Sequence, residues 1–163
     1  MAIPFLFEAA KVPGLTPAER DQVLALVVHI GLGEDTTWRG YTSWSVVQDC
    51  AQAAEAVLPG LTAWALEGCR EARTWTLALA AHHPTAWASL GVDSAQLMPN
   101  EAAAKTELVH HAVSGTLPSK RLVAEVLATE PELGEYYEEV ISESPEYRHA
   151  RMMVLELAVA GRL

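Results

Sequence analysis

Apolar side chains recur three and four positions apart along most of the chain, which is the spacing of amphipathic helices. The clearest helix start is the capping box Thr16-Pro17-Ala18-Glu19, and the apolar pattern after it ends at Gly31. No segment alternates apolar and polar residues over six positions, as a half-buried strand does. The pattern therefore predicts an all-α protein with seven or eight helices in an irregular helical bundle.

Proline and glycine mark the expected boundaries of the other helices. Pro59-Gly60 is expected to separate two helices, and Asn100 is expected to cap the helix that follows it. Further helices are predicted over residues 43–58, 62–83, 101–114, 120–129, 131–143 and 144–161, with a helical turn and a loop in 85–99.

Length and charge narrow the class of protein further. The chain has 163 residues, half of them hydrophobic, so it can bury a substantial core and we expect one all-α domain over residues 1–163. Eleven Lys and Arg residues stand against 21 Asp and Glu residues, a net charge of −10. This balance lacks the basic surface that nucleic-acid binding requires, so we expect no nucleic-acid partner.

The sequence also lacks the marks of membrane insertion and secretion. It contains no apolar stretch of 18 residues, and its first residues lack the basic and apolar regions of a signal peptide. Cys50 and Cys69 lie in apolar helical patterns without CxxC spacing, which favours two buried, reduced thiols. We therefore expect a cytoplasmic protein without a membrane partner.

Two predicted helices share a sequence pattern. Residues 70–80 and 148–158 both read RxARxxxLxLA, with six of eleven positions identical and an offset of 78 residues, twice 39. A period near 40 is typical of HEAT repeats, and Ser144-Pro145-Glu146-Tyr147-Arg148 with the apolar residues after it resembles the second helix of such a repeat. The resemblance implies a short α-solenoid of stacked helix pairs that acts as a binding scaffold. An irregular bundle remains the alternative.

Negative charge is concentrated between Leu122 and Tyr147, which we call the acidic segment. It holds eight acidic residues and no basic one, so it carries −8 of the total charge of −10. Several of the glutamates have the spacing of one helix face, with apolar and tyrosine side chains opposite. This face is either a solvated surface or a docking surface for a basic protein. The candidate partner-binding residues are Glu132, Glu135, Tyr136, Tyr137, Glu139 and Glu143.

Two ExxH motifs give an alternative based on metal binding. Glu107 and His110 form one pair, and Glu146 and His149 form the other. Residues three positions apart share a helix face, and ferritin-like bundles hold two metal ions with two such motifs and two further glutamates. The structural alternative is that Glu146 stands at a helix start, where a carboxylate interacts favourably with the helix dipole.

Two tryptophans flank a glycine-containing loop and give a third candidate site. Trp38 and Trp44 lie on either side of residues 39–43, and aromatic side chains near a loop glycine can line a ligand pocket. For Trp44 the alternative is a place in the core at a helix contact, as for the other helical tryptophans.

The chain contains no GxSxG, HExxH, zinc-type CxxC or glycine-rich phosphate loop, so no catalytic residue is predicted. We predict a non-catalytic protein–protein interaction module, without a cofactor, that binds a basic protein partner through the acidic segment. An immunity or inhibitor protein for a basic toxin would have these properties. The oligomeric state is left open.

Overall fold

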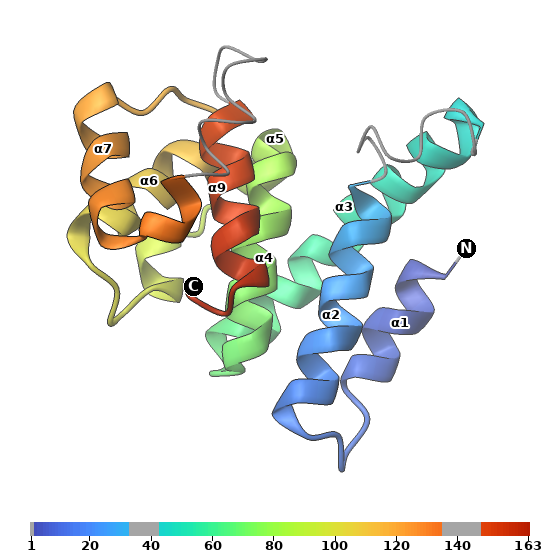
Figure 1. Cartoon of the computed structure of the whole chain (residues 1–163). Helices are drawn as coiled ribbons and strands as arrows, with labels where there is room; N and C mark the ends of the chain where they lie inside the picture. Colours follow the sequence, from blue (N-terminus) through green and yellow to red (C-terminus); the bar gives the residue numbers. More distant parts are fainter. Residues whose placement is uncertain (1, 33–42, 135–147) are drawn as a thin grey trace. The chain divides into compact units, whose positions relative to one another are not determined.

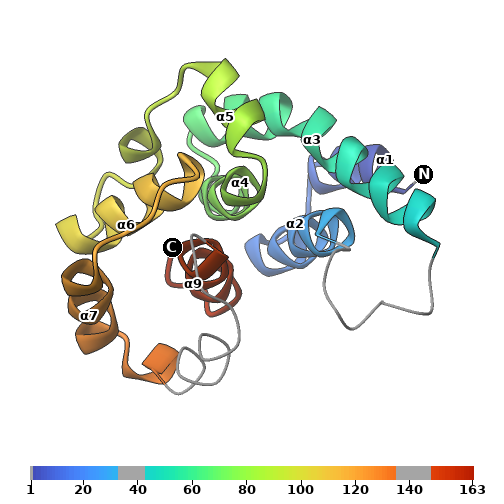
Figure 2. The same cartoon turned by 90° about the horizontal axis from the view of Figure 1, so that it is seen from above.

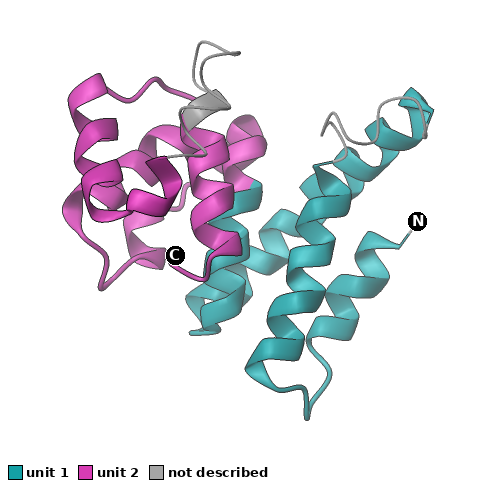
Figure 3. Ribbon diagram, viewed as in Figure 1, with its two compact units in different colours: residues 1–79 teal, residues 80–163 magenta. Residues whose placement is uncertain are grey.

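The computed structural model describes residues 2–32, 43–134 and 148–163 (Figure 1). Nine helical elements have their bounds within these residues, and the described part of the chain contains no strand. The predicted all-α class is confirmed. The chain divides into two compact units, residues 1–79 and 80–163, and each is described by itself (Figure 3). The expectation of a single domain stays a prediction.

Unit 1 contains α1 (Ile3–Ala10), α2 (Pro17–Gly31), α3 (Trp44–Leu66) and most of α4 (Arg70–His82). The predicted start of α2 is confirmed, because the Thr16 hydroxyl accepts a hydrogen bond from the Glu19 amide at 3.3 Å. The Glu19 carboxylate in turn accepts one from the Thr16 amide at 2.8 Å, and this bond lowers the pKa of Glu19.

The predicted break at Pro59-Gly60 is wrong, because α3 continues through both residues to Leu66. The buried positions Ala54, Leu58, Leu61 and Ala65 form one stripe across the proline. Burial of this stripe outweighs the roughly 3 kcal/mol that an interior proline costs a helix. Gly60 has a packing role, since a Cβ there would lie 3.1 Å from the Phe7 ring.

Three helices pack together in unit 1. α1 and α2 contact each other, and both contact α3. The Phe7 ring of α1 meets the Trp64 ring of α3 edge to face, with centroids 6.4 Å apart. Arg20 of α2 lies over the same Trp64 ring, and its Nε donates to the Ala10 carbonyl at 3.2 Å. One aromatic cluster therefore joins the three helices.

The two cysteines of unit 1 are more exposed than the sequence predicts. Cys50 and Cys69 are both half-buried, so their expected place in the core is wrong. Cys69 follows Gly68, whose positive φ of 109° ends α3, so its position follows from the turn. Partial burial raises the pKa of the Cys69 thiol.

Unit 2 is built around α6. Its elements are α5 (Pro84–Leu90), the 3₁₀-helix η2 (Ser94–Leu97), α6 (Ala103–Val113), α7 (Lys120–Thr129) and α9 (Arg148–Val159). α6 contacts each of the other four elements. Figure 2 shows α6 beside α7 and α9. Its core-facing side chains are Leu108, Val109, Ala112 and Val113. Because α7 and α9 both pack on α6, their ends lie near this one helix.

The boundaries in unit 2 were predicted unevenly. The prediction for α7 is confirmed at both ends. Asn100 is not the cap of α6, because that helix begins at Ala103 after an extended Ala102 that makes no side-chain cap. Residues 131–134 are helical, and the remainder of the predicted helix 131–143 lies outside the described residues. The expected start of the last helix near residue 144 also lies outside them.

The two copies of the shared pattern both lie in helices, α4 and α9, within the described residues. The HEAT-like solenoid stays a prediction. Among the described residues, no helix is long and apolar enough to cross a membrane.

Candidate functional site

The described part of the acidic segment begins on α7. Ser119 caps this helix by accepting a hydrogen bond from the Leu122 amide at 3.2 Å. Leu122, Val123 and Val126 are buried, and Glu125 is exposed on another side. α7 is therefore amphipathic, and its first glutamate faces solvent.

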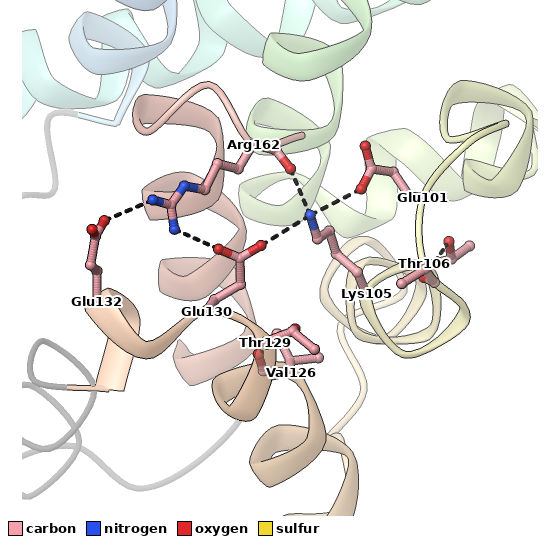
Figure 4. Close-up of polar contacts among 9 residues, drawn as sticks. Glu101, Lys105, Thr106, Val126, Thr129, Glu130, Glu132 and Arg162 are labelled. Atoms are coloured by element: carbon pink, nitrogen blue, oxygen red, sulfur yellow. Dashed lines mark hydrogen bonds and ion pairs between the residues drawn. The ribbon is translucent and has the colours of Figure 1, made fainter.

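Glu130 follows α7 and is the only charged residue that is buried among the residues the structure describes. Its side chain is only 11% exposed and lies between two cations. Arg162 Nη1 donates to one carboxylate oxygen at 2.6 Å, and Lys105 Nζ lies 3.3 Å from the other (Figure 4). A buried carboxylate is tolerated when it is paired in this way.

Lys105 has a full set of acceptors, and its side chain is 12% exposed. Besides Glu130, its ammonium group contacts Glu101 at 2.9 Å and donates to the Arg162 carbonyl at 2.9 Å. An ammonium group has three protons and no acceptor, and here it meets three oxygens (Figure 4). These oxygens belong to Glu101 just before α6, to Glu130 just after α7 and to the backbone of Arg162 after α9.

Arg162 reaches a second carboxylate of the acidic segment. Its Nη2 donates to Glu132 at 2.8 Å, so one guanidinium group joins Glu130 and Glu132. We call the following five residues the Arg162 network: Glu101, Lys105, Glu130, Glu132 and Arg162.

The network changes the acid–base properties of its members. Burial alone would raise the pKa of Glu130, but hydrogen bonds and charge from Arg162 and Lys105 bring this pKa below its ordinary value. The same hydrogen bond, together with the charges of Glu132 and Glu130, raises the pKa of Arg162. Both shifts favour the charged forms of Glu130 and Arg162 at neutral pH.

The substitution Glu130→Gln tests this arrangement through pH. A folded-state pKa below the unfolded value stabilises the fold above about pH 4.3, and this stabilisation disappears as the pH falls through the folded-state pKa. Wild type is therefore expected to be more stable than the variant at pH 7, by about 1–2 kcal/mol, and the difference is expected to vanish in acid.

Urea unfolding of both proteins between pH 7 and pH 3, followed by circular dichroism, measures this difference. Glu125→Gln removes one negative charge from the exposed side of α7 and is the matched control. A difference between wild type and Glu130→Gln that stays constant down to pH 3 would contradict the expected role of the carboxylate.

The candidate partner-binding residues are only partly described. Glu132 is the one member within the described residues, and its side chain is 80% exposed although it contacts Arg162. Glu135, Tyr136, Tyr137, Glu139 and Glu143 lie outside the described residues. The carboxylate of Glu132, the first of the candidate partner-binding residues, is thus already paired with Arg162.

The candidate aromatic site is also only partly described. Trp44 is the first residue of α3, and its side chain is 63% exposed, so its alternative place in the core is wrong. Trp38 lies outside the described residues, and the paired ligand site stays a prediction. The core positions belong to Trp75 and Trp87, which are buried.

The first of the two ExxH pairs lies on α6. Glu107 and His110 are both exposed, on the side of α6 away from the buried residues of that helix. Glu146 lies outside the described residues, and His149 lies on α9. Within the described chain no three His, Cys, Asp or Glu side chains come together as metal ligands. The four-residue metal site stays a prediction.

Lys105 and Arg162 are the residues that sequence reasoning missed. A local signal existed for Arg162, because it follows Gly161, and a glycine after an apolar helical pattern indicates a left-handed turn. No signal existed for its pairing, because 32 residues separate Arg162 from Glu130 and 57 separate it from Lys105.

Comparisons with protein-family models, with curated proteins and with solved structures find no match.

Proposed function

We propose that this protein is a non-catalytic interaction module that binds a basic protein partner through its acidic segment. The observation that carries the proposal is the distribution of charge, with eight acidic residues and no basic residue in 26 consecutive positions. A surface of one sign attracts a partner of the other sign and accelerates their association.

The geometry of α7 and of the residues after it supports the proposal. Glu125 and Glu132 are exposed, so both carboxylates are accessible to a protein partner. Glu130 is buried and paired with Lys105 of α6, so its role is to hold the part of the acidic segment after α7 against α6. The exposed carboxylates are thus held in place before a partner binds, which lowers the entropy cost of binding.

Charge reversal tests the proposal. Replacing Glu135, Glu139 and Glu143 with lysine is expected to weaken partner binding at least tenfold and to reduce its dependence on salt. The affinity of wild type is expected to fall steeply up to about 0.5 M salt, because salt screens exposed charges.

The partner is identified by pull-down from native-host lysate at low salt and by elution at about 0.5 M salt. Binding of the purified partner is then measured for each variant. A matched control reverses Asp49, Glu67 and Glu107, which are exposed and lie outside the acidic segment. Both triple variants change the net charge equally. Equal loss of affinity in both would reject the acidic segment as the binding surface, as would full affinity in the first variant.

A further inference from the structure

The residues after α9 are held in place by both backbone and side-chain contacts. Gly161 adopts the left-handed conformation, with φ of 68°. The Arg162 amide donates to the Leu157 carbonyl at 2.8 Å, and the Gly161 amide donates to the Ala158 carbonyl at 2.9 Å. These two bonds form a Schellman motif, which directs the chain back from the end of α9. The turn brings Arg162 to Glu130 and Glu132.

The Arg162 network has a shielded part and an open part. Glu130 and Lys105 are nearly buried, whereas the side chain of Arg162 is 37% exposed and that of Glu132 is 80% exposed. Water and dissolved ions therefore reach the Arg162–Glu132 pair directly. Ion pairs of this kind weaken as salt rises, while shielded pairs keep most of their strength.

The contact of α9 with α6 does not depend on these charges alone. α9 contacts α6, and its buried side chains are Ala150, Met153, Val154, Leu155, Leu157 and Ala158. Loss of the ion pairs would leave this apolar packing in place. Arg162 joins the turn after α9 to the end of α7 through its bonds to Glu130 and Glu132.

We propose that the Arg162 network is a charge-operated clasp, in which Arg162 closes the connection between the end of α9 and the end of α7. When the clasp is open, the turn after α9 and the residues around Glu130 lose their order together, while the contact between α9 and α6 persists. Competing cations open it from the exposed side at Glu132. This inference concerns the internal order of unit 2 and does not rest on the proposed partner.

Lys105 sets how far the clasp opens. Its ammonium group holds Glu130 and the Arg162 carbonyl at once, so it remains as a second link when the guanidinium group is removed. Arg162→Met should therefore open the clasp in part, and Lys105→Met combined with it should open it fully. Arg162→Lys keeps the charge but cannot reach two carboxylates with a planar fork, so an intermediate effect is expected.

Amide hydrogen exchange of the whole protein tests the clasp. One set of reporters is the amides of Ala160, Gly161 and Arg162, which are hydrogen-bonded within the turn. The other set is the amides of Glu130 and Leu133, which are hydrogen-bonded at the end of α7. In Arg162→Met both sets are expected to exchange about tenfold faster than in wild type. Amides of α2 in unit 1 are expected to keep their wild-type rates.

Arg121→Met is the matched control, because it removes an exposed cation of α7 that lies outside the Arg162 network. It should leave both reporter sets unchanged. Acceleration confined to Ala160, Gly161 and Arg162 would mean simple fraying of the helix end and would overturn the clasp, as would unchanged rates at all five amides. Equal acceleration in α2 would mean general destabilisation and would overturn it as well.

A salt titration of wild type keeps the test decisive if the variant does not fold. Raising NaCl from about 0.05 M to about 1 M should accelerate exchange at both reporter sets in parallel, since the Arg162–Glu132 pair is open to screening. Rates at both sets that stay within twofold over this range would overturn the clasp.

Discussion

Replacing Trp75 with alanine is expected to lower the free energy of unfolding by about 3–5 kcal/mol. The Trp75 side chain is 2% exposed, so its removal leaves a large cavity in unit 1. Its indole Nε1 also donates to Asp21 Oδ1 of α2 at 2.8 Å, and its ring meets His29 edge to face with centroids 6.0 Å apart. The substitution therefore removes packing and leaves the half-buried Asp21 carboxylate without its indole donor.

Two further tryptophan variants separate these effects. Trp75→Phe keeps most of the ring volume but not the donor, so its expected cost is smaller, about 1–3 kcal/mol. Trp44→Ala makes the same change at an exposed position and is expected to alter stability by at most about 0.5 kcal/mol. Urea unfolding followed by circular dichroism measures all three. If Trp75→Ala and Trp44→Ala had equal effects, Trp75 would not be a central packing residue.

The tryptophans show what the sequence could and could not predict. Each helical tryptophan lies in an apolar pattern, so a place in the core was open to all of them. The structure buries Trp75 and leaves Trp44 exposed, because Trp44 begins α3 and Trp75 lies against α2. The difference depends on which helices become neighbours, and a pattern along one helix carries no information on this point.

Helix ends were predictable where local groups satisfy them. The capping box at Thr16 and the Ser119 cap of α7 use side chains within three residues of the amides that they bind. Pro59-Gly60 failed as a boundary because the reason for the glycine is Phe7, which lies in another helix. Local chemistry is visible in a sequence, whereas close approach between helices is visible only in the fold.

The same distinction applies to the candidate site. The acidic segment is a property of composition and could be counted along the chain. That Glu130 is buried between Lys105 and Arg162 depends on contacts across 25 and 32 residues. The counted charge therefore overstates what a partner can reach, because one of the eight carboxylates is internal and another already contacts an arginine.

Replacing Gly31 with alanine is the second change expected to have a large effect, a loss of about 1–3 kcal/mol of stability. A Cβ at Gly31 would overlap the Cβ of Ala54 in α3 and would lie 3.9 Å from Leu79 Cδ1. The Ala54 Cβ is fixed to the backbone, so it cannot move aside as the end of a flexible side chain can. α2 and α3 would have to separate, and unit 1 would lose packing between them.

A reciprocal exchange tests whether this single overlap is the cause. Ala54→Gly alone is expected to cost about 1 kcal/mol, because glycine is unfavourable inside a helix. If the overlap explains the effect, the double variant Gly31→Ala with Ala54→Gly restores the space and should be no less stable than Ala54→Gly by itself. The two changes would then be coupled by about 1–3 kcal/mol.

Gly134→Ala is the control, because a Cβ at this helical glycine would meet no atom within 4 Å. It is expected to be neutral or to stabilise the protein by up to about 1 kcal/mol. Additive effects of Gly31→Ala and Ala54→Gly in urea unfolding would show that Gly31 is required for a reason other than its approach to Ala54. Coupling would show that the glycine predicted as a helix stop also sets the distance between α2 and α3.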